Sequence, residues 1–204
     1  IGCMVIVLIV LVLYFRERHD QANVKRLKPF ERLLIFSLLY FTLDIVTVYT
    51  VNHSDTVPTV VNNILHLLYL WVIDRCLLDA FLYVATILDV PLISNHWKRL
   101  AFLPHYSGCL FMLLGVGDLQ YIEGKMSYYA MGIPVLVCYA MVIYYLGLAY
   151  YVWSKYKGNL PRRSRLNFSI CVPVFLGVIV LQMFSPDALI TSLAITAIIL
   201  TAYC

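Results

Sequence analysis

Long apolar stretches alternate along the chain with short polar segments. The apolar stretches cover about residues 1–15, 33–51, 60–89, 100–116, 126–153, 168–184 and 188–204. A helix needs roughly 20 apolar residues to cross the hydrocarbon core of a bilayer, which is about 30 Å thick. The pattern therefore predicts an all-α fold: a polytopic membrane protein built as a single domain, 1–204, from a bundle of seven transmembrane helices.

The first stretch is shorter than a full span, since a helix over 1–15 rises only about 22 Å. The chain also begins with Ile1 rather than methionine, and its last apolar stretch continues to Cys204. We therefore expect the sequence to be a piece of a longer protein.

The third stretch carries an unusual number of polar groups, in the segment NNILHLLYLWVIDRCLLD from Asn62 to Asp79. Lipid offers these groups no hydrogen-bonding partner, so they face the interior of a bundle or a water-filled cavity. A helix with polar groups on several sides cannot present a broad face to lipid. We therefore place this helix at the centre of the bundle.

Helical periodicity sorts these groups onto two sides. At about 100° per residue, Asn62, His66 and Tyr69 share one stripe, whereas Arg75 and Asp79 lie on the far side. The i, i+4 spacing of Arg75 and Asp79 predicts an ion pair within the helix, which lowers the cost of both charges.

A further carboxylate, Asp44, lies near mid-depth of the second stretch, and its depth predicts a pairing with Arg75. Two interpretations of the intramembrane polar groups stay open: they hold helices together, or they bind a ligand, an ion or a proton. The candidate site residues are Asp44, Asn62, Asn63, His66, Tyr69, Asp74, Arg75, Asp79 and Gln182.

Basic residues fix the expected orientation. Of fifteen lysines and arginines, thirteen fall in three polar segments, at 16–32, 98–99 and 155–165. Cytoplasmic loops carry the excess of Lys and Arg, so the N-terminus is expected outside and the C-terminus in the cytoplasm. The net charge of +4 follows these loops, which gives no indication of a nucleic-acid partner.

Composition supports the membrane assignment, because 62% of the residues are hydrophobic, against about 45–50% in soluble domains. Six cysteines are scattered without C-x-x-C spacing, so we expect neither a disulfide framework nor a structural zinc site, and no cofactor is indicated. We interpret residues 117–125 as an outer loop, and Pro134 predicts a kink within the fifth helix.

The last two stretches, VPVFLGVIVLQMFSPDALITSLAITAIILTAYC, resemble the final helices of seven-helix sensory modules that precede diguanylate cyclase (GGDEF) domains, and sometimes histidine kinases, in Firmicutes. Pro173, Gln182 followed by Phe184, and Leu189 with Ile190 carry this resemblance, and the segment YIEGKMSYYAMGIP is also similar.

The resemblance implies an input module in the bacterial cytoplasmic membrane that senses a small-molecule or membrane signal. It implies a cytoplasmic output domain after Cys204, which forms a homodimer. No GGDEF string occurs in the sequence, so the resemblance assigns no catalytic residue.

The alternative is a small-solute or proton-coupled transporter that uses Asp44, Asp74, Arg75 and Asp79, because charges inside a bundle also suit proton relays. The two halves of the chain contain no inverted repeat, which argues against this alternative. A retinal protein is excluded because 188–204 contains no lysine, and a zinc protease is not indicated because H-E-x-x-H is absent.

Overall fold

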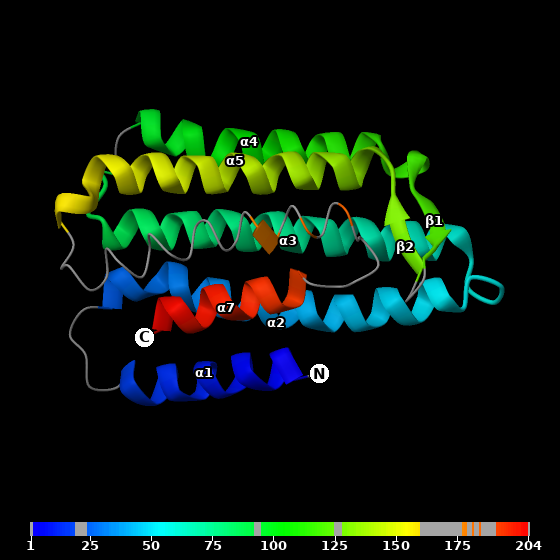
Figure 1. Cartoon of the computed structure of the whole chain (residues 1–204), viewed down its shortest axis with the longest axis horizontal. Coiled ribbons are helices and arrows are strands. Elements are labelled where there is room, and N and C mark those ends of the chain that lie inside the picture. The colour runs from blue at the N-terminus through cyan, green and yellow to red at the C-terminus, as the bar shows by residue number, and fades with distance from the viewer. Residues whose placement is uncertain are drawn as a thin grey trace.

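The structure is a computed structural model that describes residues 2–18, 24–91, 95–124, 128–159, 177–178, 181, 184 and 191–203. These residues are mostly helical, as the apolar pattern predicts. The helices run side by side along the long axis of the molecule (Figure 1). Their bounds are α1 (Gly2–Arg18), α2 (Val24–Asn52), α3 (Thr59–Ile87), α4 (Asn95–Leu114), α5 (Ile133–Tyr156) and α7 (Thr191–Tyr203).

Two helices extend into the segment that the sequence predicted as a basic cytoplasmic loop. α1 continues to Arg18, and α2 begins at Val24 rather than at residue 33. Lysine and arginine are good helix formers, so an apolar criterion marks only the part of each helix that suits lipid and misses its polar ends. The predicted sixth stretch, 168–184, lies almost entirely outside the described residues.

The helix predicted over 126–153 begins too early, because a β-hairpin occupies its first residues. β1 (Gln120–Glu123) pairs with β2 (Tyr128–Met131) in an antiparallel ladder. The helix starts only at Ile133, so Pro134 lies in its first turn. A proline there removes no helical hydrogen bond, and the predicted kink at Pro134 is therefore wrong.

α3 is the central helix of the described bundle. It packs against α2 on one side and against α4 and α5 on the other (Figure 1). Its buried side chains include Asp74 and Asp79 as well as apolar residues such as Leu78 and Phe81. α7 packs against α1 and α2.

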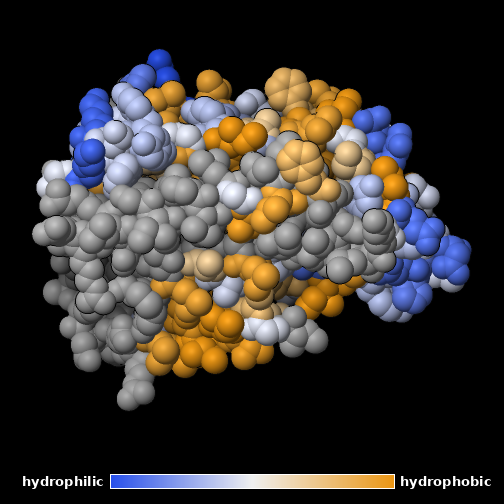
Figure 2. Space-filling model, in the orientation of Figure 1, coloured by the Kyte–Doolittle hydropathy of each residue, from blue (hydrophilic) through white to orange (hydrophobic). Residues whose placement is uncertain are grey.

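Polar residues gather at both ends of the long axis, with apolar side chains between them (Figure 2). Within the described residues, two helices are long and apolar enough to cross a lipid bilayer: α2 over Lys28–Asn52 and α5 over Ile133–Tyr156. The apolar part of α1, Gly2–Phe15, is shorter.

Candidate functional site

The polar side chains of α3 point to three different neighbours. Asn63 contacts the hairpin, and Tyr69 contacts α2. Asp74 contacts α4, and Asp79 contacts Arg32 near the start of α2. We call the first group the polar file; it comprises Asn62, Asn63, His66 and Tyr69 of α3, Tyr40 and Asp44 of α2, Tyr121 of β1 and Ser192 of α7.

The polar file begins beneath the hairpin. The Tyr121 hydroxyl donates to Asn63 Oδ1 at 2.9 Å, and Asn63 Nδ2 donates to the Val116 carbonyl at 3.5 Å. Burial raises the pKa of Tyr121 to about 12, so its hydroxyl keeps its proton at neutral pH. The Tyr121 ring lies 5.2 Å from the ring of His66, so the hairpin covers this part of α3.

Two atoms of this region lack a hydrogen-bond partner among the described residues: Asn62 Oδ1 and His66 Nδ1. Asn62 is 1% exposed and His66 is 8% exposed. A buried polar atom without a partner costs free energy that a bound water or ligand recovers. The part of the polar file around Asn62 and His66 is therefore its candidate binding point.

The file continues inward through hydroxyl groups. The His66 and Tyr69 ring centroids are 6.0 Å apart, and the Tyr69 hydroxyl donates to the Tyr40 hydroxyl at 3.5 Å, a long contact for two oxygens. The Tyr40 and Ser192 oxygens are 3.1 Å apart, and Ser192 Oγ donates to Asp44 Oδ2 at 3.1 Å.

The single proton of each hydroxyl fixes the direction of these hydrogen bonds. A hydroxyl has one proton to donate, so Ser192, which donates to Asp44, accepts from Tyr40. Tyr40 in turn accepts from Tyr69. Tyr69, Tyr40 and Ser192 therefore link α3, α2 and α7 by three hydrogen bonds that run toward the Asp44 carboxylate.

The predicted pairing of Asp44 with Arg75 is not found in the part of the chain that the structure describes. The Arg75 guanidinium lies 5.3 Å from the centre of the Phe36 ring, which fixes the register of the antiparallel helices α2 and α3. Asp44 follows Phe36 by eight residues, or about 12 Å along α2. Asp44 and Arg75 therefore differ in depth, and they take other partners.

The predicted ion pair between Arg75 and Asp79 is confirmed. Arg75 Nε lies 2.9 Å from Asp79 Oδ2, and Arg75 Nη2 donates to Asp79 Oδ1 at 3.4 Å. A second cation, Arg32 of α2, places its Nε 3.1 Å from Asp79 Oδ1. Sequence reasoning missed Arg32 because it assigned this residue to a solvated loop.

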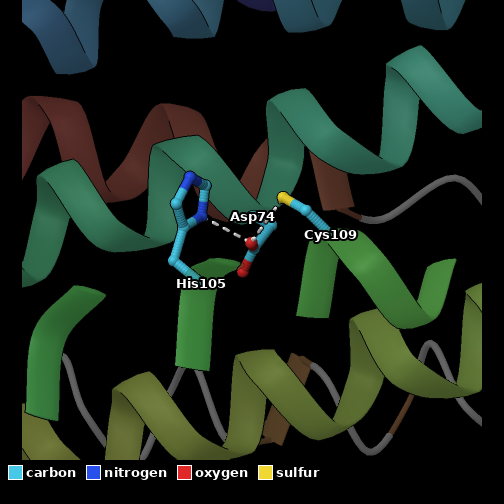
Figure 3. Close-up of side chains that lie close together, drawn as sticks. All are labelled: Asp74, His105 and Cys109. Atoms are coloured by element: carbon cyan, nitrogen blue, oxygen red, sulfur yellow. Dashed lines mark hydrogen bonds and ion pairs between the residues drawn. The ribbon is translucent and has the colours of Figure 1, made fainter. Parts of the chain in front are cut away.

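Asp74 meets two side chains of α4 that sequence reasoning did not select. Its Oδ2 lies 2.6 Å from His105 Nδ1 and accepts from Cys109 Sγ at 3.7 Å (Figure 3). His105 and Cys109 are four residues apart on α4 and so share one face. That spacing, H-x-x-x-C, was the available signal. We call Asp74, His105 and Cys109 the Asp74 cluster.

The last predicted site residue, Gln182, lies outside the described residues. The remaining eight belong to the polar file, the Asp74 cluster or the ion pair of Arg75 with Asp79, so α3 and α2 hold them all. No family model, curated protein or solved structure matches this chain.

Proposed function

We propose that the chain is a membrane-embedded sensory module of seven transmembrane helices, which regulates a cytoplasmic output domain following Cys204, of the diguanylate cyclase type. Its partners would be the lipid bilayer and a small-molecule or membrane signal, and its output domains would act as a homodimer. Any enzymatic activity would reside in that output domain.

The outer faces of the helices support the membrane part of this proposal. Large apolar side chains remain exposed along α1, α2, α4 and α5, far beyond the scattered apolar residues of a soluble surface. Examples are Ile9, Val12, Ile35, Leu39, Leu103, Leu110, Leu136 and Ile143. Figure 2 also shows an apolar zone between the polar ends, on the face that it draws.

Charge at the two ends supports the proposed orientation. Lys98 and Lys155 belong to the end of the bundle where α4 begins and α5 ends. Asp55 and Glu123 belong to the opposite end, with the hairpin. By the rule that lysine and arginine stay on the cytoplasmic side, the end with Lys98 would face the cytoplasm, as would the C-terminal end of α7.

The observation that carries the sensory part is the path from the candidate binding point to α7. Asn62 and His66 offer unpartnered buried atoms, and Tyr69, Tyr40 and Ser192 connect His66 with the helix that would lead to the output domain. A ligand that bonds to Asn62 Oδ1 and His66 Nδ1 in one helix arrangement only would bias that arrangement.

Two such hydrogen bonds supply enough free energy to shift the balance between two helix arrangements. Each hydrogen bond contributes about 1 kcal/mol, so two bonds made in a single arrangement shift the balance of two arrangements about 30-fold. That shift falls short of a complete switch, which needs about 5.5 kcal/mol, but it is enough to change an output markedly.

Replacing Ser192 with alanine should change the cyclic di-GMP level of cells that express the full-length protein by at least threefold. Ser192→Ala removes both bonds that tie α7 to Tyr40 and Asp44. The matched control is Ser107→Ala, because within the described residues Ser107 bonds only the Pro104 carbonyl of its own helix. Equal cyclic di-GMP levels in both variants and the wild type, at equal expression, would contradict the proposal.

One observation favours the alternative, a proton-coupled transporter. The hydroxyls of Tyr69, Tyr40 and Ser192 form a one-way chain onto the Asp44 carboxylate, an arrangement that suits proton transfer. Proton uptake by vesicles containing the purified protein, lost in Asp44→Asn, would establish the transporter. Unchanged uptake relative to protein-free vesicles would exclude it.

A further inference from the structure

The Asp74 cluster brings three different donor groups to one point between α3 and α4. The carboxylate of Asp74, the Nδ1 of His105 and the Sγ of Cys109 all lie within 4.8 Å of one another (Figure 3). Zinc binds nitrogen, oxygen and sulfur ligands at about 2.0–2.3 Å, so three donors this close can share a single ion.

An independent observation shows that the cluster lacks a partner. Asp74 is 0% exposed, and its Oδ1 has no hydrogen-bond partner among the described residues. The neighbouring cation, Arg75, is directed to Asp79 on the other side of α3. A buried carboxylate is costly unless both oxygens are satisfied, and His105 and Cys109 reach only Oδ2.

Charge balance points to a divalent ion. The Asp74 carboxylate and a Cys109 thiolate each carry one negative charge, and neutral His105 carries none. A divalent cation therefore leaves no net charge on the cluster, which is what a buried site requires. On binding, the Cys109 thiol gives up its proton to solvent, and the neutral His105 ring carries its one proton on Nε2, which frees Nδ1 and the Asp74 carboxylate to bind the ion; no oxidation or reduction takes place.

The geometry needs only a small change to suit zinc. Tetrahedral zinc ligands lie about 3.3–3.8 Å apart. The separation of Cys109 Sγ and Asp74 Oδ2, 3.7 Å, already falls in this range, whereas Nδ1 of His105 is 2.6 Å from Oδ2. If the Asp74 carboxylate rotated so that Oδ1, which has no partner, shared the ion, Oδ2 would move away from Nδ1 of His105.

We propose that Asp74, His105 and Cys109 bind a divalent transition-metal ion, zinc in particular, that clamps α4 to α3 at the centre of the bundle. Mixed thiolate, imidazole and carboxylate ligands suit zinc better than magnesium or calcium, which take oxygen ligands. With three protein ligands, the fourth position of the ion would hold water or a small ligand. This inference does not rest on the sensory proposal, since a metal clamp would serve a transporter equally well.

The experiment uses the full-length protein, purified in detergent, stripped with a chelator and titrated with zinc or cobalt(II). We expect one zinc per chain and, with cobalt, a near-ultraviolet absorption from thiolate-to-metal charge transfer. His105→Ala and Cys109→Ser should each weaken binding at least tenfold, and Cys109→Ser should abolish the charge-transfer band. The matched control is Cys3→Ser, a partly buried thiol on α1, which should bind as the wild type does.

Two results would overturn the metal site. The first is a folded wild-type protein that gives no charge-transfer band with cobalt(II), which is independent of whether any variant folds. The second is zinc binding by Cys109→Ser that equals binding by Cys3→Ser, because the metal would then lie elsewhere. Either result would leave His105 and Asp74 as a buried hydrogen-bonded pair.

Discussion

Replacing Asp79 with alanine should lower the stability of the full-length protein by about 3 kcal/mol, because it removes the anion that faces two arginines. Asp79 is 0% exposed, and its oxygens contact Arg75 at 2.9 Å and Arg32 at 3.1 Å. Breaking a buried ion pair costs about 3–5 kcal/mol, and the lower end applies because the Arg32 side chain is 44% exposed.

Thermal unfolding in detergent measures this effect. By the scaling of soluble proteins of this size, 3 kcal/mol corresponds to a fall in Tm of roughly 6–12 °C. Asp79→Asn keeps the volume and a hydrogen-bond acceptor, so it should lose about half as much. Asp55→Ala, in the exposed loop before α3, serves as the control with an unchanged Tm. On the same scaling, a Tm for Asp79→Ala that lies within about 2 °C of the Tm of that control would show that the contacts of Asp79 with the two arginines do not stabilise the fold.

Replacing Gly132 with alanine should disrupt the join between the hairpin and α5. Gly132 has a φ of 133°, a conformation that side chains other than glycine rarely adopt, and an added Cβ would lie 2.4 Å from the Asp118 carbonyl oxygen. The backbone strain alone costs about 1–3 kcal/mol, and the clash with a backbone atom adds to it. The Asp118 side chain also accepts from Ile133 N at 3.0 Å, so the turn cannot move away without losing that bond.

We expect Gly132→Ala to lower the Tm by about 8 °C or more, on the scaling of roughly 2–4 °C per kcal/mol, and to make the hairpin sensitive to limited proteolysis. The control is Gly117→Ala, three residues before β1, where an added Cβ meets nothing within 4 Å. If both variants unfold together with the wild type, the hairpin does not hold the conformation described. Since the Tyr121 ring of β1 packs against His66, the hairpin also covers one end of the polar file.

The sequence alone predicted the features that depend on one helix. The spacing of Arg75 and Asp79 is a property of α3 itself, and so is the common side of His66 and Tyr69. The central place of α3 followed from polar groups on several of its sides, a pattern that only neighbouring helices on each side can accommodate.

Contacts between side chains of two helices were missed. Such contacts depend on the rotation and register of the helix pair, which the sequence of one helix does not determine. Depth alone predicts a pairing of Asp44 with Arg75, yet the register of α2 and α3 places Arg75 beside Phe36, and the packing of α7 against α2 brings Ser192 to Asp44. His105 and Cys109 show the H-x-x-x-C spacing, but two residues alone do not indicate a site, and their third partner, Asp74, lies on another helix.

The hairpin was missed for a different reason. Tyr128 and Tyr129 directly precede an apolar run, so the apolar pattern includes them in the helix predicted over 126–153. Tyrosine also favours strands, and only the pairing of Tyr129 with Ile122 across the turn selects that conformation. The glycine at position 132 then separates strand from helix.

The claim that the polar file carries a signal from the hairpin end to α7 is tested most directly by a double-mutant cycle on cyclic di-GMP output of the full-length protein. The cycle combines His66→Ala with Ser192→Ala, and a control cycle combines His53→Ala, in the exposed loop, with Ser192→Ala. Because Ser192 lies downstream of His66, the double variant should give the same output as Ser192→Ala alone. Effects of His66→Ala and Ser192→Ala that multiply independently would show that the two ends of the file are not coupled.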